Sequence, residues 1–170
     1  MTSYACDHQD VVLAAQPNCR VCAQVYGTIE IPGGYVYAAE GMVGFHHPPL
    51  NDDKAYAGYL FIAPLRHARG LADLDDLEAA SLGRAMRVLS KALESIGATR
   101  VYSATIGHRD DHLHVHLVPR WPETPPDVKW YAVDEWEGAR RLDPLAIAEL
   151  CDALRGSLRP TRGDRPQAKA

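Results

Sequence analysis

The chain has 170 residues, of which 18 are basic and 22 acidic, giving a formal net charge of -4 at pH 7. This length suits one domain with a substantial core and is too short for two ordinary domains. The slightly acidic balance argues against broad, non-specific contact with nucleic acids, so we expect no stable nucleic-acid complex. A charged substrate must therefore be held by a local site.

No apolar run approaches the length of about 18 residues that a membrane-spanning helix needs, and the N-terminus has no basic start followed by an apolar stretch. Four cysteines, two of them in one Cys-x-x-Cys pair, are few for a disulfide scaffold and favour a reduced compartment. We therefore expect a cytoplasmic protein without membrane contact.

The first part of the chain contains two thiols at a spacing used by metal sites. Residues 1–16 show no clear periodicity and are interpreted as an irregular N-terminal arm, in which Cys6 and His8 have no assigned role. Cys19 and Cys22 have the spacing of a zinc knuckle. A redox pair is the main alternative, but the strand-to-helix context that this role needs is missing.

The next elements are predicted to be strands. Residues 29–46 indicate a hairpin, with a turn at Glu40-Gly41, and residues 47–53 indicate an irregular loop because they contain two prolines, an asparagine and two aspartates. Residues 58–64 form a compact apolar run ended by proline, which predicts a central strand. His67 is then expected just beyond the end of that strand.

Two amphipathic helices and one more strand are predicted further on. Residues 75–96 predict a long helix, with Asp73 as its N-cap and Gly97 at its end. Its apolar stripe comprises Leu82, Ala85, Met86, Leu89, Leu93 and Ile96. Residues 100–107 predict a strand, and residues 143–158 predict a second helix.

The segment after Arg120 begins with a stiff, proline-containing link. Residues 130–136 are rich in aromatic side chains, which could cover a base or fix the segment to the body of the protein. The tail from residue 159 is rich in Arg, Pro and Gly and is predicted to be disordered.

Residues 111–120 contain the most informative pattern in the chain. Histidine alternates with Leu or Val at His112, His114 and His116, so a β-strand would place the imidazoles on one face and the aliphatic side chains on the other. Residues two apart lie ~6.6 Å from each other along a strand, so neighbouring imidazoles can approach one phosphate-sized group. A solvated strand face and three ligands of one metal are the alternatives that this pattern alone leaves open.

The run from His112 to Arg120 resembles the active-site signature of the histidine triad (HIT) family of nucleotide hydrolases and nucleotidyl transferases and matches it in full. The Pro-x-x-His at residues 64–67, followed by Leu71-Ala72-Asp73-Leu74 at the expected start of a helix, also resembles this family. The resemblance implies an α+β fold, in which one long helix packs on an antiparallel sheet of about five strands and a C-terminal helix follows. It also implies a homodimer.

In the zinc-containing members of this family, a Cys-x-x-Cys pair, a histidine after the next strand and the first triad histidine hold the metal. The resemblance places these roles on Cys19, Cys22, His67 and His112. Four such ligands make a closed tetrahedral site, which is a structural zinc site without an open position for water. The HIT-like domain is then expected over residues 17–158, with a C-terminal extension from about residue 121 and a tail over residues 159–170.

The resemblance places the nucleophile at His114, whose neutral imidazole could attack an α-phosphorus and form a nucleotidyl-imidazole that water opens. His116 could bind a phosphate oxygen or help to protonate the leaving group. His108 stands where the family usually has Gln or Asn against phosphate. Glu40, His46 and His47 could line the nucleoside pocket, as the early hairpin does in the family. Asp110-Asp111 replaces a pair that is more commonly small or apolar.

These expectations favour a nucleotide hydrolase that cleaves a nucleoside 5'-phosphoryl bond in a dinucleoside polyphosphate, a nucleoside phosphoramidate or a similar substrate. A nucleotidyl transferase or phosphorylase, with phosphate or a sugar phosphate as acceptor, is the alternative among enzymes. A zinc-bearing module that binds a nucleotide without turnover is the alternative from another class.

Overall fold

The structure is a computed structural model that describes residues 16, 18–49, 53–108 and 110–158. The predictions for the N-terminal arm, except its last residue, and for the C-terminal tail lie outside the described residues. Cys6 and His8 lie there too.

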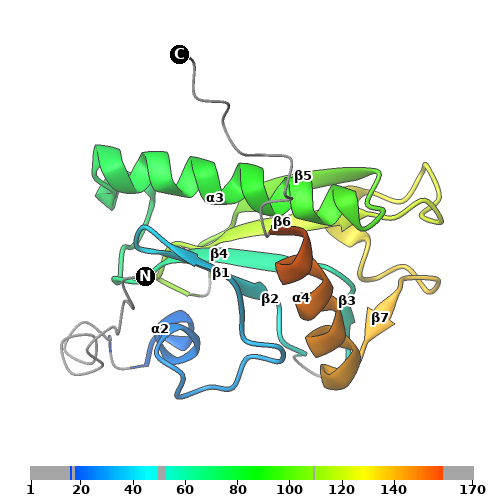
Figure 1. The fold of residues 1–170 in the computed structure, drawn as a ribbon, viewed down its shortest axis with the longest axis horizontal. Helices are drawn as coiled ribbons and strands as arrows, with labels where there is room; N and C mark the ends of the chain where they lie inside the picture. Colours follow the sequence, from blue (N-terminus) through cyan, green and yellow to red (C-terminus); the bar gives the residue numbers. More distant parts are fainter. Residues whose placement is uncertain (1–15, 17, 50–52, 109, 159–170) are drawn as a thin grey trace, which may run out of the picture.

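A five-stranded antiparallel sheet forms the centre of the molecule (Figure 1). Its strands lie in the order β1-β2-β4-β6-β5, and every neighbouring pair is antiparallel. They are β1 (Tyr35–Ala39), β2 (Met42–His46), β4 (Leu60–Pro64), β5 (Arg100–Thr105) and β6 (Val115–Arg120). A second, two-stranded sheet, which the sequence analysis did not predict, pairs β3 (Ala55–Tyr56) with β7 (Arg141–Leu142).

Within the described residues, three α-helices and two short 3-10 helices surround the sheet. The α-helices are α2 (Arg20–Val25), α3 (Asp76–Ser95) and α4 (Pro144–Leu158), and the 3-10 helices are η1 (Leu71–Asp73) and η2 (Trp130–Ala132). The long helix and the C-terminal helix confirm the predicted α+β fold class. The short helix α2 was not predicted.

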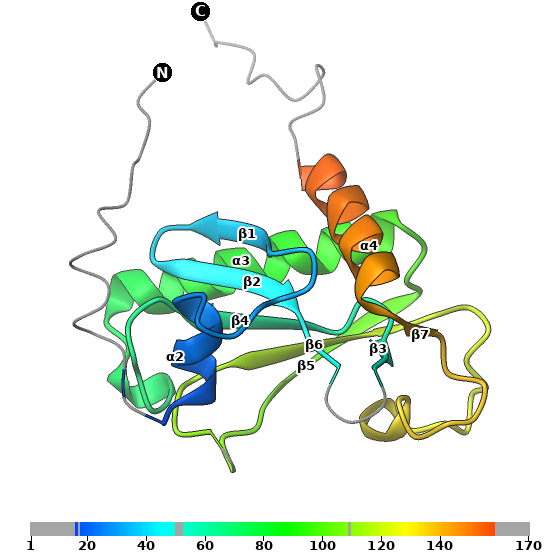
Figure 2. The same ribbon diagram turned by 90° about the horizontal axis from the view of Figure 1, so that it is seen from below.

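The two faces of the sheet carry different cores, because side chains alternate along each strand. Ile62 of β4 and Val115 of β6 belong to one buried cluster together with Leu89 of α3. Phe61 belongs to a second cluster on the other face, where Val21 of α2 also packs. Seen from below, α2 lies in front of the sheet and α3 passes behind it (Figure 2).

The β1–β2 hairpin turns at the predicted place. Glu40 has φ of 52° and Gly41 has φ of 77°, and tight two-residue hairpin turns of type I′ need positive φ at both central residues. In the next strand, Gly44 lies under α3, where an added Cβ would come within 2.6 Å of a Leu89 methyl group. The helix can therefore sit close to β2.

The N-cap of α3 is Asp75, so the prediction of Asp73 was wrong. The Asp75 carboxylate accepts from the Glu78 N–H at 2.8 Å, and the Glu78 carboxylate accepts from the Asp75 N–H at 3.0 Å, forming a capping box. Asp73 ends η1, and its carboxylate accepts from the main-chain N–H of Arg69 at 2.7 Å. At the other end of the helix, Gly97 has a φ of 109°.

The histidine strand is shorter than predicted, because β6 begins at Val115. Its partner β4 ends at Pro64, which has no N–H to continue the ladder. Leu113 instead donates its N–H to the Ala68 carbonyl at 2.6 Å. His112 and His114 therefore precede the strand.

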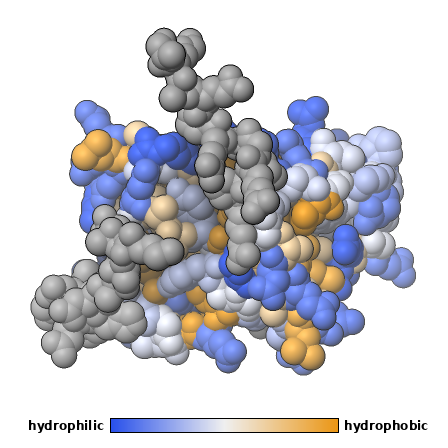
Figure 3. Space-filling view, in the orientation of Figure 1, coloured by the Kyte–Doolittle hydropathy of each residue, from blue (hydrophilic) through white to orange (hydrophobic). Residues whose placement is uncertain are grey.

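The C-terminal part packs onto the body. The Trp130 ring stacks on Tyr102 of β5 with 5.9 Å between ring centroids, in agreement with a packing role for this aromatic segment. Within the ranges that the structure describes, no helix is both long enough and apolar enough to cross a membrane. The face shown in Figure 3 is largely hydrophilic, with separate hydrophobic residues among the polar ones.

Candidate functional site

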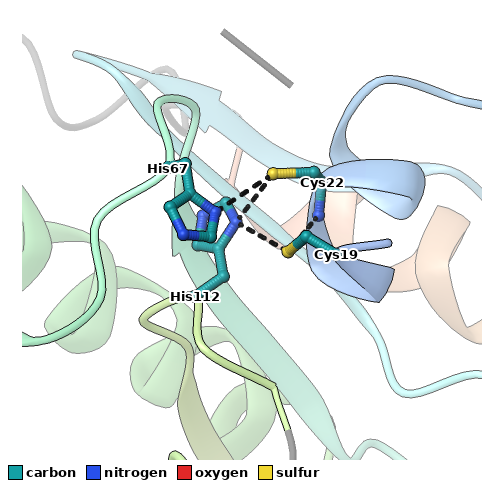
Figure 4. A group of neighbouring side chains, drawn as sticks. All are labelled: Cys19, Cys22, His67 and His112. Carbon is teal, nitrogen blue, oxygen red and sulfur yellow. Dashed lines mark hydrogen bonds between the residues drawn. The ribbon is translucent and has the colours of Figure 1, made fainter. Parts of the chain in front are cut away.

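Two cysteines from α2 and its N-cap face two histidines from the loops at the end of the sheet (Figure 4). One potential ligand atom from each of Cys19, Cys22, His67 and His112 lies within 4.8 Å of the other three. The Cys22 Sγ is 3.4 Å from His67 Nδ1 and 3.3 Å from His112 Nδ1, and the Cys19 Sγ is 3.7 Å from His112 Nδ1. The four residues that were predicted to bind zinc are therefore together.

The distances and the donor types fit a tetrahedral zinc ion. With Zn–S bonds of about 2.3 Å and Zn–N bonds of about 2.0 to 2.1 Å, the S–N edges of a tetrahedron measure about 3.6 Å. His112 Nε2 must donate to the Pro64 carbonyl, 3.1 Å away, which leaves the Nδ1 lone pair facing the thiols. Burial raises the pKa of the Cys22 thiol, so its thiolate needs a cation beside it.

A cavity of about 340 Å³ lies next to this cluster on the α2 face of the sheet. It is lined by Arg20, Val21, Gln24, His47, Pro48, Phe61, Ile106, His108, Asp110, His114 and His116. The lining thus combines aliphatic and aromatic side chains with groups that can bind phosphate, and this combination is typical of small-molecule sites.

His114 presents one defined nitrogen to the cavity. Its Nδ1 lies 2.7 Å from the carbonyl oxygen of His112, and because a carbonyl can only accept, Nδ1 carries the proton. In the neutral ring, Nε2 then has the free lone pair. The ring is 6% exposed and packs against Phe61 at 5.0 Å between centroids, so its orientation is held on both sides.

His116 lies two residues further along and lines the same cavity. Its Nδ1 is 2.7 Å from the Tyr59 hydroxyl, while its buried Nε2 has no hydrogen-bond partner. Burial lowers the pKa of His116 to about 4, and the nearby His114 contributes in the same direction. His116 is therefore a neutral imidazole at physiological pH.

The cavity mouth carries opposite charges. Arg20, the first residue of α2, is exposed at the mouth and lies between the two zinc-site cysteines in the sequence. Asp110 lines the cavity as well, so one of the two unusual carboxylates does face the site. Asp111 faces away, since it pairs with Arg69 at 3.0 Å.

The structure places His108 on the cavity wall, where its contact with phosphate stays a prediction, but it places Glu40 elsewhere. The Glu40 carboxylate accepts from Arg84 at 2.7 Å and from the Ser81 hydroxyl at 3.2 Å. The β1–β2 turn thus presents Glu40 to α3, the helix that carries Arg84 and Ser81, and Glu40 is not among the residues that line the cavity. The assignment of Glu40 to the nucleoside pocket was therefore wrong.

His46 and His47 have different environments although they are adjacent. His46 is fully buried, donates from Nδ1 to the His47 carbonyl at 2.7 Å and accepts from the Gly58 N–H at 3.0 Å. It is a structural histidine with both nitrogens bonded. His47 lines the cavity, and burial lowers its pKa to about 4.

Sequence reasoning missed three residues of the site. Arg20 and Gln24 were overlooked because the Cys-x-x-Cys pair was interpreted as a knuckle and not as the start of a helix. Tyr59 was assigned to the central strand as an apolar residue. One feature of the sequence could have identified Arg20 as a site residue, because it is a cation between two predicted metal ligands.

Comparisons with known proteins were made with both sequence and structure. No family model matches the chain. Over 71 residues the chain is 37% identical to an "AP-4-A phosphorylase" of Mycobacterium tuberculosis, and the match covers 38% of this chain and 36% of that protein. The same match occurs in a second strain. The matched region is thus about a third of these curated relatives.

Three solved structures show the same architecture. A "Hit-like protein" from Bartonella henselae has a TM-score of 0.62 at 18% identity, covering 85% of this chain and 98% of that chain. A hypothetical histidine triad nucleotide-binding protein from Sulfolobus tokodaii has a TM-score of 0.60 at 19% identity, covering 82% and 91%. A Zn-bound histidine triad family protein from Mycobacterium smegmatis has a TM-score of 0.59 at 21% identity, covering 83% and 93%.

Proposed function

We propose that this chain, which has the fold of the histidine triad proteins, is a nucleotide hydrolase that cleaves a nucleoside 5'-phosphoryl bond through a nucleotidyl intermediate on His114. The observation that carries this proposal is the hydrogen bond from His114 Nδ1 to the His112 carbonyl, which leaves Nε2 free in a cavity of about 340 Å³. A dinucleoside polyphosphate and a nucleoside phosphoramidate are the substrate classes of this proposal.

The reaction needs two displacements at one phosphorus. In the first, the His114 Nε2 lone pair forms a bond to the α-phosphorus and the bond to the leaving group breaks. In the second, a water oxygen bonds to the same phosphorus, the P–N bond breaks, and the nucleoside monophosphate leaves while the imidazole becomes neutral again. His116 and His108 supply hydrogen bonds to the phosphate from the cavity wall.

The proposal includes one zinc ion held by Cys19, Cys22, His67 and His112. This ion would supply no reacting group, because its four protein ligands close the tetrahedron. It would fix α2 to the loop that precedes β6, and so keep Arg20 and His114 on two walls of one cavity. The Zn-bound neighbour from Mycobacterium smegmatis supports this part of the proposal.

A phosphorylase is the second candidate, because the matched relative is named as one. The two enzymes differ only in the acceptor of the nucleotidyl group, which is water in one and inorganic phosphate in the other. Diadenosine tetraphosphate should therefore be incubated in ¹⁸O-labelled water with and without phosphate. The hydrolase gives ¹⁸O-labelled AMP and unlabelled ATP in both cases. A phosphorylase gives ADP and ATP, and only when phosphate is present.

A non-catalytic nucleotide-binding module is distinguished by the same assay. Such a module would bind nucleoside monophosphates, as measured by calorimetry, and would leave diadenosine tetraphosphate and adenosine phosphoramidate intact. Turnover of either compound by the wild-type chain, and its loss in a His114 variant, would exclude this alternative.

We expect Arg20→Gln to raise KM for a nucleotide substrate about tenfold and to change kcat much less. Arg20 is a cation on the cavity wall, and a charge-assisted hydrogen bond to phosphate is worth about 1.5 to 3 kcal/mol. The steady-state parameters of the variant are the measurement. Arg87→Gln on the exposed side of α3 is the matched control. Equal KM values in wild type and Arg20→Gln would contradict the role.

The proposal also covers the organisation of the chain. We infer one domain over residues 17–158, since Trp121, Val133 and Ile147 of the C-terminal extension belong to the same buried cluster as the sheet. We further propose a cytoplasmic homodimer. The edge strand β5 supports this, because in the described residues only one of its sides is paired. Light scattering at several protein concentrations tests the dimer.

A further inference from the structure

His116 is held at one nitrogen and left open at the other. Its Nδ1 lies 2.7 Å from the Tyr59 hydroxyl, and its Nε2 is buried without a hydrogen-bond partner on the wall of the cavity. Buried polar atoms without partners are rare, and they often indicate a bound group that the atom serves. A phosphoryl oxygen of the substrate in this cavity would be such a partner.

The hydrogen bond to Tyr59 can be oriented in two ways. If Tyr59 donates, its hydroxyl proton is satisfied, Nδ1 accepts, and Nε2 carries the imidazole proton into the cavity. If Nδ1 donates, the Tyr59 hydroxyl proton has no partner among the described contacts, and Nε2 presents a lone pair to the cavity. Because unsatisfied polar groups in a partly buried position cost free energy, the first arrangement is favoured.

We propose that Tyr59 is a positioning residue that donates to His116 Nδ1 and thereby fixes the tautomer in which His116 Nε2–H points at a phosphoryl oxygen of the substrate. The two histidines of the cavity then have opposite roles. His114 offers a lone pair to phosphorus, while His116 offers a proton donor to oxygen. This inference rests on the proposed function, since it assigns a role at the same phosphate.

The surroundings of His116 allow this neutral donor. The rings of Phe61, His114 and Tyr59 pack around it at 4.7, 4.9 and 5.7 Å between centroids. His47 on the neighbouring wall lowers the pKa of His116 further, while the main-chain carbonyl of Ile106 opposes this change. This carbonyl lies near the ring, but outside the geometry that would make it a hydrogen-bond partner of Nε2. Burial raises the pKa of Tyr59 to about 12, so the phenol keeps the proton that it donates.

The tautomer can be measured without turnover. In the zinc-loaded full chain labelled with ¹⁵N-histidine, His116 should show a pyrrole-type shift at Nε2 and a pyridine-type shift at Nδ1. In Tyr59→Phe the two shifts should move toward each other, because the donor is lost. A proton on Nδ1 in the wild type, or unchanged shifts in Tyr59→Phe, would overturn the proposal whether or not the chain is a hydrolase.

The kinetic test compares the partly buried Tyr59 with the buried Tyr56. Tyr59→Phe should lower kcat about five- to tenfold with little change in KM, since the misplaced proton matters most where charge grows on the phosphoryl oxygens. Tyr56→Phe removes a buried hydroxyl that donates to the Pro119 carbonyl at 3.1 Å, and it should leave both parameters unchanged. Equal losses in the two variants would show a merely structural effect and overturn the assignment. No turnover in the wild type would overturn the proposed function, and the tautomer measurement would still decide the role of Tyr59.

Discussion

His114→Ala is expected to abolish turnover, with kcat falling by about 10⁴-fold or more. The variant loses the atom that would bond to phosphorus, and direct attack by water would have to replace the two-step route. His116 cannot take over, because its Nδ1 is bonded to Tyr59 and its Nε2 is assigned a proton. The measurement is single-turnover and steady-state kinetics with diadenosine tetraphosphate.

The control for this prediction separates chemistry from folding. His114→Ala should keep its zinc and bind AMP. The ring of His114 packs against Phe61 and His116 and bonds the main-chain carbonyl of His112, whereas His112 would bind zinc through its side chain. In His114→Gly, added imidazole should restore part of the rate, since the small molecule can occupy the place of the ring. Full activity in His114→Ala would contradict the nucleophile assignment.

Cys22→Ser is expected to release zinc and to lower the free energy of unfolding by about 3 kcal/mol or more. Cys22 is 1% exposed, and its Sγ lies at 3.3 and 3.4 Å from the ligand nitrogens of His112 and His67. A serine hydroxyl is a poor zinc ligand, so the remaining three ligands would hold the ion weakly. Zinc content by atomic emission and urea denaturation are the measurements.

Cys151→Ser is the matched control, because Cys151 is also a buried free cysteine but lies in α4, against the backbone of Gly33. Burying a hydroxyl there also costs stability, so zinc content separates the two variants. Cys151→Ser should keep about one zinc per chain. A wild-type chain that is stable and free of metal after dialysis against a chelator would contradict the zinc assignment without affecting the role of His114.

The sequence predicted the sheet and the long helices because their signals are local. The alternation around His114, the apolar run that ends at Pro64 and the helical stripe containing Leu89 each depend on neighbouring residues. The first and last residues of these elements were harder to predict, because several neighbouring residues can carry the same local signal. Asp73 and Asp75 are equally good N-caps as residue types, and only Glu78, three residues after Asp75, completes the capping box.

The parts of the site that could not be predicted depend on contacts between distant segments. Tyr59 and His116 are 57 residues apart, and only the pairing of β4 with β6 brings them together. For Glu40 the sequence predicted a contact that the fold does not make. It was placed in the pocket by its position in the early hairpin, but the turn presents its carboxylate to Arg84 on α3.

The two departures from the usual pattern before the triad have different consequences. Asp111 pairs with the exposed Arg69 and is turned away from the cavity, so it adds little repulsion. Asp110 lines the cavity and would oppose a highly anionic leaving group unless a cation such as Arg20 compensates for it. A comparison of diadenosine tetraphosphate with adenosine phosphoramidate as substrates therefore reports on the leaving-group side of the site.

The most direct measurement is intact-protein mass spectrometry of a reaction quenched within one turnover, followed by peptide mapping under conditions that keep a phosphorus–nitrogen bond. The account predicts an added nucleoside monophosphate group on His114 in the wild type and no adduct in His114→Ala. An adduct on another residue, or turnover of the wild type through a route that leaves the protein unmodified at every quench time, would contradict it.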